Sequence, residues 1–290
     1  MNSYLLAVLL GIIEGLTEFL PVSSTAHLRI FEALLGVDLT DSYWKMFSIV
    51  IQLGAILCLP IYFRDRIAKF VRTFPDGERG DRTALNHPLT LVLIAFVFTA
   101  VPTFLLTKII GKHLESLTVM GMSLVIGGIL MWVIDVLYDR GTLPRRADHM
   151  EQMGLGQSIW VGLCQVLAAV FPGTSRSMAT IAAGQLGGMS RSAALEFSFF
   201  VSIPTMAAAT SYDLLKAVRG EDGGPSALGS ISFTLHNWTV LAVGFVVSFI
   251  VAYGVVAWFM GWVRRRGFVP FAVYRIVFGA VVLWWAMAGR

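Results

Sequence analysis

The sequence predicts an all-α polytopic membrane protein with two inverted repeats, each a re-entrant helical hairpin followed by three transmembrane helices. Of its 290 residues, 56% are hydrophobic and only 14% are charged, and the mean hydropathy is +0.74. Soluble domains carry about a quarter charged residues, so this composition excludes an ordinary soluble protein. Apolar runs close to the roughly 20 residues that cross a bilayer occur at 46–63, 89–107, 117–138, 192–213, 237–260 and 268–288.

A duplication is predicted from two segments that align without a gap. Residues 11–28 (GIIEGLTEFLPVSSTAHL) match residues 162–179 (GLCQVLAAVFPGTSRSMA) at an offset of 151 residues. Pro21 then pairs with Pro172, and both prolines interrupt an otherwise apolar stretch. Duplicated halves with interrupted helices are common in membrane transporters.

The whole chain is therefore predicted to be a single integral membrane domain over residues 1–290. Repeat 1 covers about residues 1–140, and repeat 2 covers about residues 152–290. Because each repeat holds three true spans, an odd number, the second repeat is inverted relative to the first. Arginine and lysine gather in the loops of one face, which the positive-inside rule makes cytoplasmic. The first hairpin then opens to the outside, the second opens to the cytoplasm, and the two breaks meet near the bilayer midplane.

The first hairpin is predicted to break at a proline. A helix ends near Leu20, because Pro21 lacks an N–H group and would clash with the carbonyl of Thr17. Ser23 or Ser24 then caps a second helix, since serine is a preferred N-cap residue.

The second hairpin is predicted to repeat this arrangement. It breaks at Pro172 and Gly173, and its second helix starts at Thr174 or Ser175. Irregular backbone at membrane depth is tolerated only when it is buried in protein or lines a wet cavity. The two breaks are therefore expected to be functional.

The two breaks are predicted to form an anion site. Helix N-termini expose unpaired N–H groups with partial positive charge, and phosphate commonly binds there. Arg176 adds a guanidinium whose fork suits phosphate oxygens; at the offset of 151 its counterpart is Thr25, so the repeats have diverged here. Further contacts to a diphosphate are expected from Ser23, Thr25, Thr174, Ser175 and Ser177.

Two carboxylates beside a phosphate require an explanation. Glu14 and Glu18 are four residues apart and share one helix face. A divalent cation, Mg²⁺ or Ca²⁺, would bridge carboxylate and phosphate oxygens. Alternatively, the close pair shares a proton in a low dielectric. Ionisable groups inside a membrane are costly and functional by default.

His27 points to chemistry rather than binding alone. Of five histidines, it is the one in the re-entrant region, three residues after Ser24. A hydroxyl beside an imidazole is an activated nucleophile. The structural alternatives are a kink with a cap for the Pro-Ser-Ser motif and an interhelical hydrogen bond for the histidine.

Three other charged residues receive no firm role. Glu196 follows Arg191 by five residues, which suggests a structural ion pair or support for the site. Asp135 and Arg275 stay unassigned.

Four segments resemble a known family: EGLTEFLPVSSTAHL, VIQLGAIL, FPGTSRSMATI and MSRSAALEFSFFVSIPTM. They are similar to the bacterial undecaprenyl-diphosphate phosphatases associated with bacitracin resistance, and the likeness runs from about Leu9 to the final span. The resemblance implies hydrolysis of undecaprenyl diphosphate to undecaprenyl phosphate, which recycles the lipid carrier of peptidoglycan synthesis. It also implies a divalent metal and places function on Glu14, Glu18, Ser24, His27 and Arg176.

The expected reaction is a phosphoryl transfer in which Ser24, His27 or water is the nucleophile; the sequence does not choose among them. We expect a multi-pass protein of the bacterial cytoplasmic membrane, with its active site open to the outer face. The expected partners are undecaprenyl diphosphate and membrane lipid, without nucleic acid; a homodimer is left open. A transporter or flippase for an anionic isoprenoid lipid is the alternative function, because inverted repeats with broken helices also build transporters.

Overall fold

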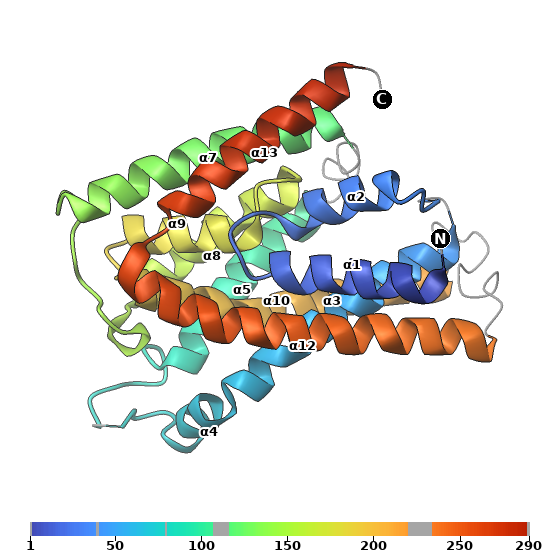
Figure 1. Ribbon diagram of the computed structural model, residues 1–290. Helices are drawn as coiled ribbons and strands as arrows, with labels where there is room; N and C mark the ends of the chain where they lie inside the picture. The colour runs from blue at the N-terminus through green and yellow to red at the C-terminus, as the bar shows by residue number, and fades with distance from the viewer. Residues whose placement is uncertain (1, 39–40, 79, 107–115, 220–233, 289–290) are drawn as a thin grey trace. The chain divides into compact units, whose positions relative to one another are not determined.

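The computed structural model describes residues 2–38, 41–78, 80–106, 116–219 and 234–288. These residues form helices joined by loops (Figure 1). Among them, the helices long and apolar enough to cross a membrane are α3 (Ser42–Tyr62), α5 (Pro88–Leu105), α7 (Leu117–Asp139), α10 (Arg191–Arg219), α12 (Leu235–Arg266) and α13 (Val269–Met287). The six predicted apolar runs fall on these helices, so the prediction of an all-α polytopic membrane protein is confirmed.

Shorter helices occupy the two regions predicted as hairpins. The first region contains α1 (Ser3–Thr17) and α2 (Ser24–Leu34), and the second contains α8 (Leu155–Val170) and α9 (Arg176–Leu186). The remaining short elements are α4 (Arg64–Arg72) and the 3₁₀ helix η1 (Met150–Gln152). The helix–break–helix arrangement is therefore present in both regions, while the duplication, its inversion and the repeat boundaries stay predictions.

The chain divides into two compact units. Unit 1 consists of Met1–Phe19, Ser24–Tyr62 and Ser202–Ala257. Unit 2 consists of Leu20–Ser23, Phe63–Val201 and Trp258–Arg290. The break of the first hairpin, residues 20–23, thus belongs to unit 2, whereas the helices on either side of it belong to unit 1.

In unit 1, glycines bring α1 into close contact with α12. A Cβ atom added at Gly11 would lie 2.8 Å from the carbonyl oxygen of Gly244, and one added at Gly15 would lie 2.8 Å from that of Ser248. Only glycine permits backbones to approach this closely. The contact fixes the final turns of α1, which contain Glu14 and are followed directly by Glu18 at the C-cap.

In unit 2, α8 packs against α5 in a similar way. A Cβ atom at Gly162 would lie 2.5 Å from the carbonyl oxygen of Ala95. The Thr99 hydroxyl donates to the Gly162 carbonyl at 2.8 Å, and the side-chain amide of Gln165 donates to the Thr99 hydroxyl at 2.9 Å. Gln165 aligns with Glu14 at the offset of 151, yet here it joins two helices.

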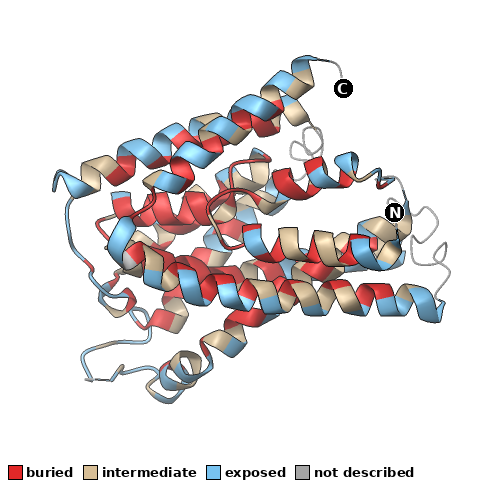
Figure 2. Cartoon of the chain, in the orientation of Figure 1, coloured by how far each residue is buried: buried red, intermediate tan, exposed pale blue. Residues whose placement is uncertain are grey.

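The remaining support for the second hairpin comes from α7, which packs along α13 (Figure 1). A Cβ atom at Gly279 would lie 2.9 Å from the Gly121 carbonyl oxygen, and one at Gly128 would lie 2.9 Å from that of Ala272. α7 and α8 both contact α9, which is buried along most of its length (Figure 2).

Candidate active site

The first break begins several residues before Pro21. α1 ends at Thr17, three residues before the predicted end at Leu20. Thr17 is the residue whose carbonyl a helical Pro21 would need to bond, and proline has no N–H group for that bond. The Glu18 N–H still donates to the Glu14 carbonyl at 2.9 Å, and a tight turn follows in which the Val22 N–H donates to the Leu20 carbonyl at 2.8 Å. The short turn places Glu18 next to the start of α2.

The second break depends on a glycine. Gly173 has a φ of +94°, and a Cβ atom there would lie 2.5 Å from the carbonyl oxygen of Met120. α9 then begins at Arg176, and the hydroxyl oxygen of Ser175 accepts the Met178 N–H at 3.3 Å. Of the two caps predicted here, Thr174 and Ser175, the structure therefore selects Ser175.

Both breaks end in a strained serine. Ser23 has a φ of +74° and Ser175 a φ of +69°, and they are the non-glycine residues with positive φ in the part of the chain that the structure describes. Such a conformation costs about 1–3 kcal/mol and persists mainly at functional sites. The strain singles out these two serines more strongly than their sequence does.

The two strained serines occupy similar positions in the two breaks. They are 152 residues apart and each directly precedes a helix, α2 or α9. Arg176 and Ser24 are therefore the first residues of their helices, and they are 152 residues apart because the turn after Pro172 is one residue longer than the turn after Pro21. The pairing of Arg176 with Thr25 at the offset of 151 stays a prediction.

The acidic side of the predicted site is built in unit 1. Glu14 is fully buried and Glu18 is 7% exposed. The Ser24 hydroxyl donates a hydrogen bond to Oε2 of Glu18, and the two oxygen atoms are 2.5 Å apart. The structure thus joins a candidate nucleophile to a candidate metal ligand across the break.

His27 lies one turn further along α2 and is buried. Sequence reasoning paired Ser24 with His27 because both are on one helix face. It missed Glu18 as a partner, since that contact crosses a turn whose geometry cannot be read from the sequence. Thr25, between them, is exposed.

The basic side of the predicted site lies in unit 2. Arg176 is half-buried at the first position of α9. Three residues with buried hydroxyl groups lie around the start of α9: Thr174, Ser175 and Ser177. Ser23, which is also buried, is the last residue of the first break. The acidic side lies in unit 1 and Arg176 lies in unit 2. That the two sides form one site stays a prediction.

A divalent cation has two candidate ligands on the acidic side. Among the described residues, no three His, Cys, Asp or Glu side chains gather as a complete set of metal ligands. Glu14 and Glu18 instead offer two buried carboxylates one helical turn apart. Mg²⁺ commonly binds one or two carboxylates together with water and substrate phosphates. The pair fits that kind of binding.

Two of the unassigned residues have structural partners in unit 2. Asp135 is buried and accepts hydrogen bonds from Arg191 Nε at 2.7 Å and from the Phe268 N–H at 2.7 Å, so it anchors the start of α13. Glu196 pairs with Arg66, whose Nε lies 2.9 Å from Glu196 Oε1. The predicted pair of Glu196 with Arg191 is therefore wrong, because Asp135 engages that arginine.

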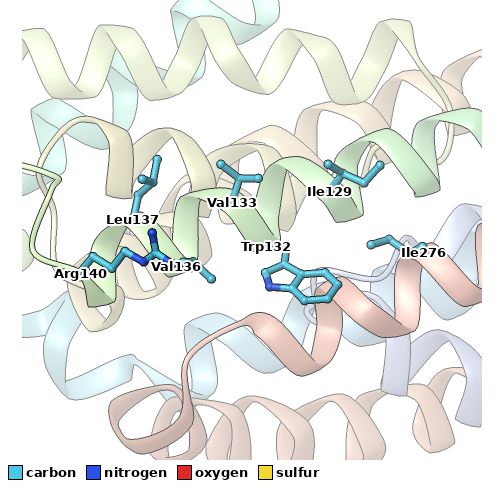
Figure 3. Close-up of a pocket in the computed structure, with 7 residues that line it drawn as sticks. All are labelled: Ile129, Trp132, Val133, Val136, Leu137, Arg140 and Ile276. Carbon is cyan, nitrogen blue, oxygen red and sulfur yellow. The ribbon is translucent and has the colours of Figure 1, made fainter.

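An apolar groove of about 410 Å³ also lies in unit 2 (Figure 3). It is lined by Ile129, Trp132, Val133, Val136 and Leu137 of α7, by Arg140 at the C-cap of that helix, and by Ile276 of α13. None of the predicted site residues lines it. The groove is therefore a feature of the α7–α13 surface and separate from the candidate chemistry.

The fold and these polar groups define a class: a multi-pass membrane protein with buried acids, hydroxyls and a basic residue at broken helices. Residues 7–281 match the family described as "Bacitracin resistance protein BacA". The chain belongs to this family. It is 69% identical to an undecaprenyl-diphosphatase of Koribacter versatilis (strain Ellin345) over 288 residues, which are 99% of each chain. It is 42% identical to an undecaprenyl-diphosphatase of Rhizobium etli (strain CIAT 652) over 99% of this chain and 98% of the relative. It is also 38% identical to an undecaprenyl-diphosphatase of Caldanaerobacter subterraneus subsp. tengcongensis over 98% of this chain and 96% of the relative.

Proposed function

We propose that this protein hydrolyses undecaprenyl diphosphate to undecaprenyl phosphate and inorganic phosphate. This reaction returns the lipid carrier to peptidoglycan synthesis, and it confers bacitracin resistance. The name shared by relatives that match the full chain supports the activity. The structural observation that carries the proposal is the 2.5 Å hydrogen bond from Ser24 to Glu18, because it pairs a nucleophile with a proton acceptor inside a membrane protein.

In the proposed first step, Ser24 attacks the terminal phosphorus of the lipid diphosphate. A bond forms between Ser24 Oγ and that phosphorus, and the bond from the phosphorus to the bridging oxygen breaks. Undecaprenyl phosphate leaves with the electron pair, and the hydroxyl proton of Ser24 passes to the Glu18 carboxylate. A carboxylate in hydrogen-bond contact is a suitable general base for this transfer.

In the proposed second step, water hydrolyses the phosphoserine. The water oxygen attacks the phosphorus, the bond from phosphorus to Ser24 Oγ breaks, and Glu18 returns its proton to the serine. His27, one turn along α2, receives the proton that the water loses and then passes it to the departing phosphate, so the imidazole is neutral again. Inorganic phosphate departs and both carboxylates of the acidic side are ionised again.

Charge stabilisation comes from the residues of the breaks. The N-termini of α2 and α9 provide backbone N–H groups for phosphate oxygens, and Arg176 provides a guanidinium. Glu14 and Glu18 would hold a divalent cation, which supplies neutralisation of the diphosphate when bound. Donors aimed at developing charge are usually the largest contribution to such catalysis.

The setting of the site is part of the proposal. We place the protein in the bacterial cytoplasmic membrane, with the site open to the outer face. The loops rich in arginine and lysine favour the cytoplasmic side for their own face, and the first hairpin then opens on the other side. The names of the relatives support a hydrolase and not the transporter or flippase considered from the sequence.

Phosphate release by the purified protein in detergent tests the proposal. We expect steady release from undecaprenyl diphosphate that stops when divalent cations are chelated. Ser24→Ala should lower the rate at least about 10³-fold, the scale of removing a nucleophile. Ser48→Ala is the matched control, because Ser48 donates to Glu32 at 2.7 Å in the same unit but lies outside the breaks. Absence of phosphate release with both Mg²⁺ and Ca²⁺ would refute the phosphatase, because an enzyme turns over its substrate in detergent. A transporter would release no phosphate in this assay.

A further inference from the structure

A buried arginine in the last helix contacts both breaks. Arg275 of α13 is fully buried. Its Nη1 donates to the carbonyl oxygen of Pro21 at 3.0 Å, and its Nη2 donates to the carbonyl oxygen of Gly173 at 3.1 Å. A third bond, at 3.2 Å, joins Nη2 to the carbonyl oxygen of Ser123 in α7. One guanidinium therefore links the two interrupted segments to the α7–α13 pair.

The two carbonyls occupy equivalent positions. Pro21 is two residues before the strained Ser23, and Gly173 is two residues before the strained Ser175. Each strained serine in turn directly precedes the helix that begins with Ser24 or Arg176. Strained backbone persists only where the surroundings hold it in place, and the two nitrogens of Arg275 bind it at the same point of each break.

The surroundings of Arg275 are shaped for the guanidinium. A Cβ atom at Gly127 of α7 would lie 2.5 Å from Nη2 and 2.7 Å from Cε of Met178. Glycine at this position therefore leaves the space that the guanidinium fills. In the part of the chain that the structure describes, no carboxylate forms an ion pair with Arg275, and its charge is met by three carbonyl dipoles. Burying an arginine without a carboxylate partner costs free energy. Charged residues inside membrane proteins therefore indicate a functional role.

We propose that Arg275 is a positioning residue that holds the two breaks in the strained conformation required for the reaction. It acts through the carbonyls of Pro21 and Gly173, and so through Ser24 on one side and Arg176 on the other. The kinetic part of this inference rests on the proposed phosphatase activity; the structural part does not.

The kinetic test uses two substitutions that weaken the contacts of Arg275 with the two carbonyls in different ways. Arg275→Lys keeps the charge but provides one nitrogen in place of a fork, and Gly127→Ala keeps the arginine but pushes its Nη2 away from the carbonyls. Both should lower kcat about 10²-fold, the cost of misplacing catalytic groups by about 1 Å, with KM changed much less. Gly261→Ala is the matched control, because a Cβ atom there meets no atom within 4 Å.

Hydrogen–deuterium exchange provides a readout without substrate. Arg275→Lys and Gly127→Ala should speed exchange of backbone amides at 20–24 and 172–178 about tenfold or more, while peptides of α7 and α13 keep wild-type rates. Wild-type kcat, or wild-type exchange at both breaks, in these variants would overturn the proposal. Faster exchange along the whole of α7 and α13 would also overturn it, since it would show a packing role alone. If wild-type protein released no phosphate, the proposed function would fail, and the exchange experiment would still decide the role of Arg275.

Discussion

Relief of the backbone strain at Ser175 should stabilise the protein relative to a matched substitution while lowering its activity. Ser175 caps α9 with a φ of +69°, and Ser116 caps α7 with a φ of −76°. The cap bond is 3.3 Å long in both cases, to Met178 N–H and Val119 N–H respectively. Replacing either serine with glycine removes the same bond, but only Ser175→Gly also removes strain, because glycine adopts positive φ readily.

The magnitude follows from the difference between the two sites. Loss of a serine cap to glycine costs a few tenths of a kcal/mol, and the added freedom of glycine in the unfolded chain costs about 0.4–1 kcal/mol. Both costs are shared by Ser175→Gly and Ser116→Gly, so they cancel in the comparison. The remaining difference is the strain energy, about 1–3 kcal/mol for a residue held in a sparsely populated backbone conformation.

Reversible unfolding in mixtures of detergent and SDS, followed by tryptophan fluorescence, measures both free energies of unfolding. Ser175→Gly should be more stable than Ser116→Gly by about 1–3 kcal/mol, yet it should release phosphate about 10²-fold more slowly, because a hydroxyl proposed to bind the anion is lost. Equal free energies for the two variants would show that the Ser175 conformation stores no strain. Full activity of Ser175→Gly would show that the Ser175 hydroxyl has no role in the reaction.

Three further predictions concern charge. Arg176→Lys should lower kcat by roughly 10²-fold with a smaller change in KM, because it loses the bidentate fork while keeping the charge; near-normal turnover would reduce Arg176 to a point charge. Glu14→Gln and Glu18→Gln should both shift the Mg²⁺ concentration for half-maximal activity upwards, and Glu18→Gln should also lower the plateau, because Glu18 is the proposed base; an unchanged metal titration in both variants would contradict their role as cation ligands. His87 is buried, and its Nδ1 accepts the Leu89 N–H at 3.3 Å at the start of α5. Burial, and secondarily the charge of Arg82, lower the pKa of His87. A lowered histidine pKa stabilises the fold above the unfolded value of about 6.5, and this contribution is lost as the pH falls. The unfolding temperature of the wild type should therefore drop more between about pH 7.5 and pH 5.5 than that of His87→Asn, which keeps a cap acceptor; parallel pH curves would contradict this.

The spans and the breaks could be predicted from the sequence because their causes are local. Hydropathy over about 20 residues defines a membrane helix, and the helices at 42–62 and 117–139 follow their apolar runs closely. A proline forbids the hydrogen bond to the residue four before it, which places the first break near Pro21. The exact end at Thr17 depends on the turn that follows, which is not encoded in any single residue.

The contacts that organise the candidate site could not be predicted because they join distant or conformationally unusual residues. Ser23 and Ser175 have no sequence signal for positive φ, which usually marks glycine. The Ser24–Glu18 bond depends on a tight turn, and Arg275 reaches Pro21 across 254 residues. A pattern of helical spacing favours neighbours such as Ser24 and His27, and it has no means of finding a partner on another element.

A rapid-quench experiment with undecaprenyl diphosphate labelled in its terminal phosphate tests the role of the Ser24–Glu18 pair most directly. Label should appear on Ser24 as an acid-stable, base-labile phosphoester before free phosphate accumulates. Ser24→Ala should carry no label and release almost no phosphate, Glu18→Gln should form the adduct much more slowly, and Ser48→Ala should match the wild type. Label on His27 as an acid-labile adduct, or near-normal release by Ser24→Ala, would contradict the central role given to the Ser24–Glu18 pair.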